Sequence, residues 1–331
     1  MSGEQVIGLY GGCGGCAGKQ HAGHRHWEDV GRMYVYVSCG ALTTLSNILV
    51  LLVVVKSGKC RLLGFLAVGD FLFGLATLIS GTVRLIYLDR CIYYDQIERA
   101  WCLLTPWFHL FAVGYFWPAI GTCLICVERV LALHAALWYR THWNTQFENK
   151  VMAAALSVIC ACIAPAYVTV LLDVTQTTVE RQCGFGQVME TAYSLFYTHF
   201  QGVCGCCSIL THVFVLLTSK RKFARMTSTA QIQREKRMNR SVSAVVTLTA
   251  LLIVLPWLVS VLNVANQWSS FNGEIARRII VVSYQANSAL NFFMYLCFNS
   301  DFREFTVNSL FRTRKAPVRI FTATNLPTPA L

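Results

Sequence analysis

The sequence contains few charged residues. Asp, Glu, Lys and Arg make up 13% of its 331 residues, whereas apolar residues make up 55% and the mean hydropathy is +0.49. A water-soluble globular domain has about 25% charged residues. By length the chain could form two soluble domains, but it has too few charges to cover their surfaces. The composition therefore excludes an ordinary soluble protein and indicates that lipid surrounds most of the chain.

The N-terminal region lacks the apolar core of a cleavable signal peptide. We therefore expect residues 1–32 to form an extracellular tail rich in Gly, Cys and His, and the first apolar stretch to act as its own insertion signal. The segments expected outside the cell also contain no Asn-x-Ser/Thr sequon, which excludes N-glycosylation there.

The tail combines residue types that bind metals. Cys13 and Cys16 form a C-x-x-C pair and are followed by His21, His24 and His26, which are ligands suited to Zn²⁺ or Cu²⁺. The favoured alternative is a Gly-rich tail in which Cys13 pairs with Cys16 or with nothing, since oxidation outside the cell disables thiolates. We expect no functional metal site and no cofactor.

Seven apolar stretches are each long enough to cross about 30 Å of hydrocarbon as a helix. They predict an all-α fold, a seven-transmembrane helix bundle. The fifth stretch contains polar Thr198, His199 and Gln201, which we expect to point into the bundle because unsatisfied polar groups are costly in lipid. The seven stretches are residues 33–55, 62–85, 103–131, 151–172, 193–217, 242–264 and 279–298.

Positive charges gather in alternate connections between these stretches. They lie after the first, third and fifth stretches and in the C-terminal tail, and the net charge is +12. Cytosolic loops carry such an excess of Lys and Arg, so we expect a multi-pass plasma-membrane protein with its N-terminus extracellular and its C-terminus cytosolic. This distribution argues against nucleic acid as a partner. Residues 301–311 alternate charged and apolar side chains and predict a short amphipathic eighth helix on the cytosolic leaflet.

Asp70 lies in the middle of the second stretch. An Asp at a helix centre costs about 2.5–3.5 kcal/mol on insertion, so it should face the bundle interior and have partners. Asn47, Asn287 and Asn291 lie at a similar depth. Two interpretations stay open, a purely structural polar cluster and a cluster that also rearranges between states.

Other motifs occur in register with Asp70. Glu128-Arg129 lies at the cytosolic end of the third stretch, where a helix-end ion pair is the simplest explanation. The residues that form the series are Asn47; Leu66, Ala67 and Asp70; Glu128, Arg129 and Val130; Pro256; Asn287, Ser288, Asn291, Phe292 and Tyr295; and Phe298 and Phe302. In this order and on these stretches they resemble the motifs of rhodopsin-like (class A) G-protein-coupled receptors, and the resemblance covers nearly all of the chain after residue 33.

The sequence also departs from that family's pattern. Val254 replaces the aromatic residue expected two positions before Pro256, and Phe292 replaces a proline. Pro118 stands where a sodium-binding Ser is common, which puts the family's sodium site in doubt. Divergence of this kind is similar to that of nematode chemosensory serpentine receptors.

The resemblance implies a receptor domain over residues 33–298 and a cytosolic amphipathic helix and tail over 299–331. It implies that the protein is not an enzyme and that it activates a heterotrimeric G protein. Glu128 and Arg129 would lie at the surface that couples to the G protein, and the basic loops would contact anionic membrane lipid. The polar network that changes on activation would comprise Asn47, Asp70, Asn287, Asn291 and Tyr295.

The ligand, a chemosensory small molecule or a neuropeptide, should bind in the outer half of the bundle. Receptors for amines in this family carry an Asp at the position of Phe111, and opsins carry a retinal-binding Lys at the position of Gln285. Because both residues are replaced here, neither a cationic amine nor attached retinal is expected as the ligand. Core packing is the alternative for any single aromatic residue. The expected ligand-binding residues are His109, Phe111, Tyr115, Trp257, Ser260, Tyr284 and Gln285.

The resemblance also implies a disulfide between Cys102 and Cys183. Cys91 is expected outside the cell as well and could compete for Cys183.

A seven-span transporter or ligand-gated channel is the alternative function. Transport usually needs several ionisable groups inside the membrane, and Asp70 stands nearly alone there. A membrane enzyme is less consistent still, because the spans contain no cluster of His, Asp and Glu at metal-ligand spacing.

Overall fold

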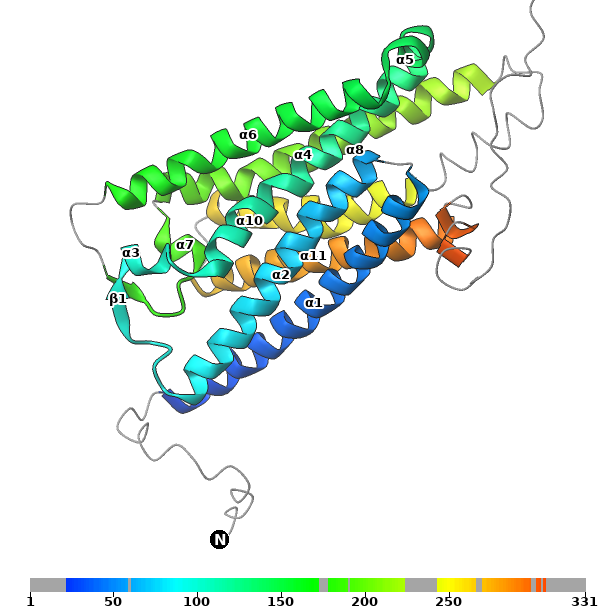
Figure 1. The fold of residues 1–331 in the computed structure, drawn as a ribbon. Coiled ribbons are helices and arrows are strands. Elements are labelled where there is room, and N and C mark those ends of the chain that lie inside the picture. Colours follow the sequence, from blue (N-terminus) through cyan, green and yellow to red (C-terminus); the bar gives the residue numbers. More distant parts are fainter. Residues whose placement is uncertain are drawn as a thin grey trace, which may run out of the picture.

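Long helices account for most of the protein. The computed structural model describes residues 22–58, 61–172, 178–189, 191–223, 243–265, 270–298, 302–304 and 306–307. Figure 1 shows the long helices running side by side as one elongated bundle. The helices are α1 (Ala22–Ser57), α2 (Arg61–Asp89), α3 (Arg99–Cys102), α4 (Pro106–His134), α5 (Ala136–His142), α6 (Thr145–Leu171), α7 (Phe185–Val188), α8 (Thr191–Phe223), the π-helical turn η1 (Ala250–Val254), α10 (Leu255–Ala265) and α11 (Ser270–Phe298).

Six helical segments of the described chain are long and apolar enough to cross a membrane. They correspond to the first six predicted spans, so the expectation of a membrane-embedded helical bundle is confirmed to that extent. The seventh predicted span lies in α11, which has 29 residues. Its middle carries Gln285, Asn287, Ser288 and Asn291, and these polar residues lower its apolar character.

The first and third predicted spans begin at different residues from those expected. α1 begins at Ala22, so the helix extends well into the segment predicted as a tail. Cys102 ends the separate short helix α3, and α4 starts only at Pro106. Proline is favoured at the first position of a helix, because a backbone N–H at that position would make no hydrogen bond within the helix.

Neighbouring helices form a closed ring. In order of contact the ring runs α1, α2, α4, α8, α10, α11 and back to α1, and α6 packs outside against α4 and α2. Among the six apolar segments, α2 is the most enclosed. In its most apolar part 61% of the residues are buried, compared with 11% in the segment that contains η1. Of these segments α2 therefore lies deepest in the bundle.

Glycines allow the backbones of neighbouring helices to approach closely. A Cβ at Gly40 of α1 would lie 2.6 Å from the backbone N of Leu78, and one at Gly114 of α4 would lie 2.6 Å from the backbone N of Phe73. Both contacts are with α2. Small residues at helix interfaces are typical of membrane bundles, where packing replaces the hydrophobic effect as the driving force.

Large apolar side chains cover the outer surface of the bundle. In water, apolar surface of this extent would favour aggregation, whereas in lipid it faces a matching solvent. Examples on the long helices are Leu45, Val55, Leu171, Leu195, Leu210 and Leu262.

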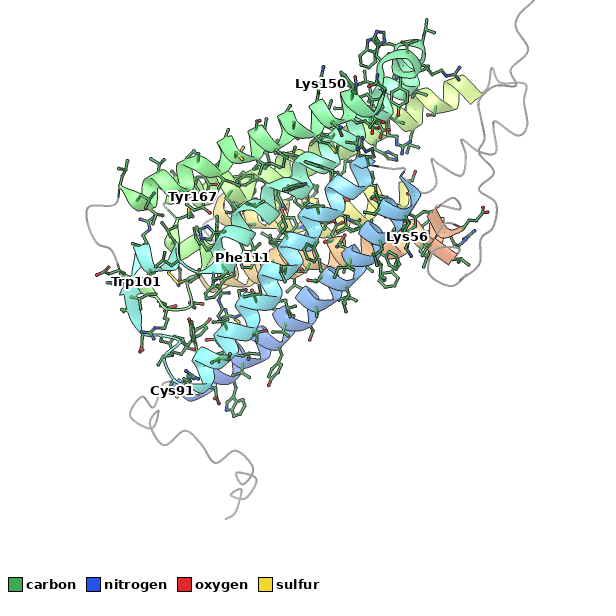
Figure 2. The ribbon with its side chains drawn as sticks, in the orientation of Figure 1. Lys56, Cys91, Trp101, Phe111, Lys150 and Tyr167 are labelled. Atoms are coloured by element: carbon green, nitrogen blue, oxygen red, sulfur yellow. A yellow bond between two sulfur atoms is a disulfide. The ribbon has the colours of Figure 1, made fainter. Side chains whose placement is uncertain are left out.

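The two ends of the bundle differ in structure. At one end, strands β1 (Gln96–Glu98) and β2 (Thr178–Glu180) pair antiparallel, with Ile97 opposite Val179. We call this the disulfide end, because it carries the bond between Cys102 and Cys183, and we call the opposite end, which carries α5, the Arg129 end. Figure 2 shows Lys56 and Lys150 at the Arg129 end and Cys91 and Trp101 at the disulfide end.

Pro256 follows a π-helical turn. The turn spans Ala250–Val254, and regular α-helix resumes at Leu255. Proline has no N–H and crowds the carbonyl four residues before it, and a wider turn is one way to accommodate both effects. The sixth span therefore departs from regular α-helix just before Pro256.

The polar run of the fifth span divides between two environments. Gln201 is buried as predicted, and its Nε2 donates a hydrogen bond to the carbonyl of Tyr115 at 2.6 Å. The prediction was wrong for His199, which is exposed. Its Nδ1 accepts a hydrogen bond from Nε1 of Trp257 at 3.1 Å, so the ring has a polar partner even on the outer surface.

Two predictions fall wholly or partly outside the described residues. Cys13, Cys16 and His21 lie outside them, as do the side chains of His24 and His26. Of the predicted eighth helix, residues 302–304 and 306–307 are described and are helical. Phe302 is buried there, with its ring centroid 6.2 Å from that of Phe292.

Candidate functional site

A buried polar cluster joins α1, α2 and α11. Asp70 on α2 is 4% exposed, and its Oδ2 accepts a hydrogen bond from Nδ2 of Asn291 at 3.4 Å. Asn47 on α1 donates from Nδ2 to Oγ of Ser288 at 3.3 Å and to the carbonyl of Thr43 at 2.9 Å. Ser288 also hydrogen-bonds the Asp70 carboxylate. Three of the four residues predicted to lie at one depth, Asn47, Asp70 and Asn291, therefore belong to one connected cluster.

The other two residues predicted for the polar network are Asn287 and Tyr295, both on α11. Asn287 accepts a hydrogen bond at Oδ1 from Oγ1 of Thr249 at 3.5 Å, which links α11 to the helical residues before η1. Tyr295 of α11 packs against an apolar group that includes Phe292 and Phe302, with its ring centroid 5.8 Å from that of Phe302. Of the five residues predicted for the polar network, Asn47, Asp70 and Asn291 therefore belong to the polar cluster, whereas Asn287 and Tyr295 make contacts of their own.

Aromatic side chains fill the bundle nearer the disulfide end. Tyr115 on α4 stacks on Tyr197 of α8 with ring centroids 3.6 Å apart, and it meets Tyr284 of α11 edge-on at 5.6 Å. Phe73 of α2 completes the group and contacts Phe111 at 5.7 Å. We call these five residues the aromatic cluster. Three of the predicted ligand residues, Phe111, Tyr115 and Tyr284, belong to it.

Gln285 lies next to this cluster and connects three helices. It is 0% exposed. Its Nε2 donates a hydrogen bond to Oγ1 of Thr77 on α2, and its carbonyl accepts one from Oγ1 of Thr43 on α1 at 3.1 Å. Its Oε1 and that of Gln201 have no hydrogen-bond partner among the described residues. Buried polar atoms are rarely left unsatisfied, so these two oxygens are acceptors available to a ligand or to water.

The remaining predicted ligand residues lie elsewhere. His109 faces α6, where its Nδ1 lies 2.6 Å from Oη of Tyr167 and the two rings stack. Trp257 lies between α10 and α8, and a Cβ at Gly202 would meet its indole at 2.1 Å. Ser260 is half-buried on α10. The structure therefore separates His109 and Trp257 from the aromatic cluster.

Several members of these groups carried no clear signal in the sequence. Phe73, Thr77 and Tyr197 have no motif around them, and in an apolar helix an aromatic residue is ordinary. Gln201 could have been found, because it interrupts an otherwise apolar stretch.

At the Arg129 end, the helix α5 contacts the Glu128-Arg129 motif. Oη of Tyr139 on α5 donates a hydrogen bond to Oε1 of Glu128 at 2.8 Å. Burial, together with this contact, raises the pKa of the Tyr139 phenol. Arg129 is half-buried beside it. Leu137, two residues before Tyr139, is 80% exposed, so an apolar side chain projects from the surface next to the motif.

The predicted disulfide is present. Cys102 and Cys183 are bonded, with Cα atoms 5.4 Å apart, and both are buried. Cys91 is itself disulfide-bonded, so it does not compete for Cys183. Cys102 ends α3 and Cys183 follows β2, which means that the bond fixes the β1–β2 sheet to the start of α4.

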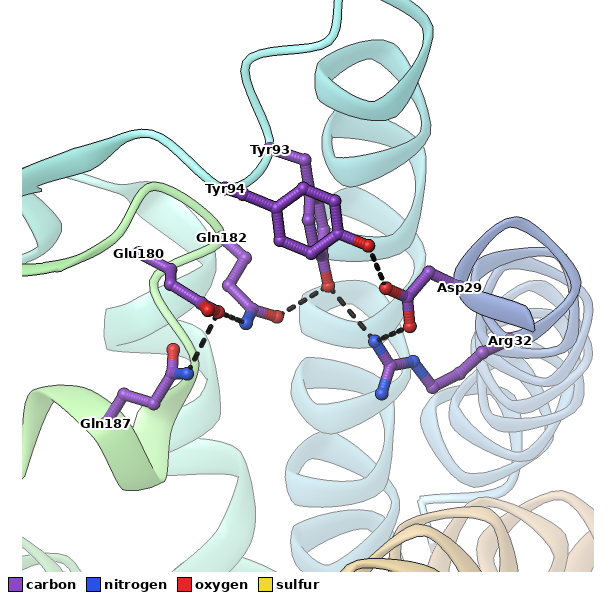
Figure 3. A network of polar contacts seen from close by, with 7 residues as sticks. All are labelled: Asp29, Arg32, Tyr93, Tyr94, Glu180, Gln182 and Gln187. Carbon is purple, nitrogen blue, oxygen red and sulfur yellow. Dashed lines mark hydrogen bonds and ion pairs between the residues drawn. The ribbon is translucent and has the colours of Figure 1, made fainter. Parts of the chain in front are cut away.

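A polar network holds the same sheet against α1 and α2 (Figure 3). Arg32 forms an ion pair with Asp29 and donates from Nη2 to Oη of Tyr93 at 3.2 Å. Tyr93 donates in turn to Oε1 of Gln182, and Tyr94 donates to the Asp29 carboxylate. This chain of contacts runs from the start of α1 to the residue that precedes the disulfide.

Arg84 of α2 holds the same loop through its backbone. It is 7% exposed, and it donates from Nε to the carbonyl of Gln182 at 2.9 Å and from Nη2 to that of Cys183 at 3.3 Å. A buried arginine is normally paired or fully hydrogen-bonded. Here its acceptors are backbone carbonyls, so the loop after β2 is held against α2 by a cation.

No protein-family model matches the sequence, and no curated protein matches it either. The resemblance to rhodopsin-like receptors therefore rests on the motif residues themselves. Three contacts in the structure join residues of these motifs. They link Asp70 to Asn291, Asn47 to Ser288, and Cys102 to Cys183.

Proposed function

We propose that the protein is a receptor of the plasma membrane that senses an extracellular ligand and activates a heterotrimeric G protein. In this proposal seven helices span the membrane, with α11 as the seventh and a short eighth helix after it. The disulfide end is extracellular, because disulfides persist in oxidising compartments. The Arg129 end is cytosolic, in agreement with the excess of basic residues in the loops assigned to it.

The polar cluster around Asp70 is the observation that carries the proposal. It connects α1, α2 and α11 through side chains at the positions where the sequence resembles rhodopsin-like receptors. A carboxylate is costly at this depth, and a purely structural contact between helices would not require one. Hydrogen bonds of 3.3–3.5 Å are long, which suits a cluster that exchanges partners between two states.

The ligand would act on the aromatic cluster. Tyr115, Tyr197 and Tyr284 come from three different helices, so a ligand that separates them would shift α4, α8 and α11 relative to one another. Such a ligand changes the receptor only to the extent that it binds one arrangement better than the other. The free acceptors Oε1 of Gln201 and Oε1 of Gln285 favour a neutral small molecule or a peptide with hydrogen-bond donors, in keeping with a chemosensory receptor.

The G protein would bind at the Arg129 end. In the resting arrangement Tyr139 holds Glu128, and rearrangement of the segment that carries Pro256 would expose Arg129 to the partner. The π-helical turn before Pro256 provides a place where this segment can bend without breaking a regular helix. The basic residues of the segment between α8 and η1, outside the described residues, would meet anionic lipid and the G protein.

Arg129→Ala tests the coupling role. The full-length protein is expressed in cultured cells with luciferase-tagged G proteins of each class, and recruitment is measured on addition of a panel of neutral odorants and peptides. We expect at least one ligand and G-protein pair to give a signal that Arg129→Ala abolishes at equal surface expression. Arg140→Ala is the matched control, because Arg140 is an exposed cation on α5, and it should leave the signal intact. A signal that survives in Arg129→Ala, or ligand-driven ion flux without G-protein recruitment, would refute the proposal.

A further inference from the structure

An open cavity of about 370 Å³ lies at the disulfide end, apart from the aromatic cluster. Small-molecule sites in proteins occupy about 300–1,000 Å³, so this cavity is large enough for a small ligand. It is lined by Tyr87 from the end of α2, Ile97 of β1, Trp101 of α3, Thr105, Arg181 and Cys183.

Arg181 gives this cavity its charge. Nε of Arg181 is buried and has no hydrogen-bond partner among the described residues. Its Nη2 lies 4.0 Å from Oδ2 of Asp95, and the two side chains are 37% and 50% exposed, so that ion pair is weak. The backbone N–H of Arg181 donates to the carbonyl of Asp95 at 2.8 Å, which holds the backbone of this residue at the edge of the cavity. A guanidinium with unused donors is suited to a carboxylate, which it can bind through two parallel hydrogen bonds.

A second cation lies behind the cavity. Arg84 lies one helical turn before Tyr87 on α2. Its hydrogen-bond acceptors are the carbonyls of Gln182 and Cys183, and within the described chain it forms no ion pair. Its charge therefore adds to the positive potential near Arg181 and is only weakly screened by solvent. Tyr87, Ile97 and Trp101 provide aromatic and apolar walls, Thr105 adds a hydroxyl group, and Trp101 is 59% exposed.

We propose that this cavity binds a small molecule that carries an anionic group on an apolar or aromatic body. Arg181 binds the anionic group, while Trp101 and Tyr87 pack against the body. The site is separate from the aromatic cluster and does not depend on the proposed signalling function, because binding here requires only that the disulfide end be accessible.

A pair of isosteric probes tests the site. The purified full-length protein in phosphatidylcholine nanodiscs is titrated with indole-3-acetate and, separately, with neutral indole-3-acetamide, and binding is followed by saturation-transfer NMR with empty nanodiscs as the background. A charge-assisted pair favours the acid over the amide by about tenfold or more in Kd. Equal affinity for the two probes, or binding of neither, would overturn the inference.

Variants identify the residues that provide the preference. Arg181→Gln should bring the two dissociation constants together, and Arg181→Lys should restore part of the difference. Trp101→Ala should weaken both probes by a similar factor, because it removes packing and no charge. Arg90→Gln is the control for net charge, since Arg90 is exposed and does not line the cavity, and it should retain the wild-type preference. A preference for the acid that persists in Arg181→Gln would refute the assignment.

Discussion

Replacing Gly40 with alanine should destabilise the bundle by forcing α1 away from α2. The added Cβ would lie 2.6 Å from the backbone N of Leu78 and 2.9 Å from the carbonyl O of Gly74. Both atoms belong to the backbone of α2, so no side-chain rotation relieves the contact and one helix must move. Overpacking of a close-packed core costs about 1–3 kcal/mol, and we take about 3 kcal/mol here because the obstacle is rigid.

An opposing term comes from the helix itself. Alanine favours helix over glycine by about 1 kcal/mol, so the net loss at Gly40 should be about 2 kcal/mol. Gly31 is the matched control on the same helix, since a Cβ there meets nothing within 4 Å. Gly31→Ala should therefore be neutral or stabilise by up to about 1 kcal/mol, which places the two variants about 2–3 kcal/mol apart.

Thermal unfolding in detergent micelles measures this difference. The free cysteines of the long helices become reactive on unfolding, so a fluorogenic maleimide reports the transition without added labels. A difference of about 2–3 kcal/mol corresponds to melting temperatures about 5–10 °C apart. If Gly40→Ala melts at or above the temperature of Gly31→Ala, then α1 and α2 do not pack as closely as the glycine contact requires.

Two further predictions concern the disulfide end. Arg84→Gln should increase the rate at which a phosphine reduces the buried Cys102–Cys183 bond by about tenfold, because two charge-assisted hydrogen bonds to the loop after β2 are lost. The control Arg90→Gln should leave this rate unchanged. Equal reduction rates in the two variants would contradict the role of Arg84. Burial and the Asp29 carboxylate raise the pKa of the Tyr94 phenol. The folded protein therefore keeps this phenol protonated while the unfolded chain ionises above about pH 10, so its contribution to stability is complete below that pH and is lost as the pH rises. The melting temperature of the wild type should fall more steeply above about pH 10 than that of Tyr94→Phe, and parallel curves would show that Tyr94 does not contribute.

The helical architecture follows from composition and apolar length. Six of the predicted spans coincide with helices that are long and apolar enough to cross a membrane, because a backbone in lipid must satisfy its own hydrogen bonds and a helix does so within one segment. The polar exceptions in these stretches were equally informative. Asp70, Asn47 and Asn291 were expected to meet because a polar side chain in lipid needs a partner, and they belong to one connected cluster.

Helix ends were less predictable from the sequence. α1 starts at Ala22, and the polar residues at its beginning gave no sign of helix because they lie outside the apolar stretch. Asp29 and Arg32 form an ion pair one turn apart there, and Tyr93 and Tyr94 from another loop contact it. Contacts between segments far apart in the sequence therefore help to set where this helix begins.

The sequence by itself predicted a bundle of membrane helices and the burial of Asp70, Asn47 and Asn291, and its resemblance to rhodopsin-like receptors implied the bond between Cys102 and Cys183. Only the tertiary structure decided which way each apolar or aromatic residue faces. His109 and Tyr115 belong to the same helix, yet one contacts α6 and the other joins the aromatic cluster. Similarly, Gln285 connects α1 and α2. The physical reason is that helices in lipid are apolar on all sides, so the pattern of apolar residues does not mark the inner face, and orientation is set by the close backbone contacts at residues such as Gly40 and Gly114.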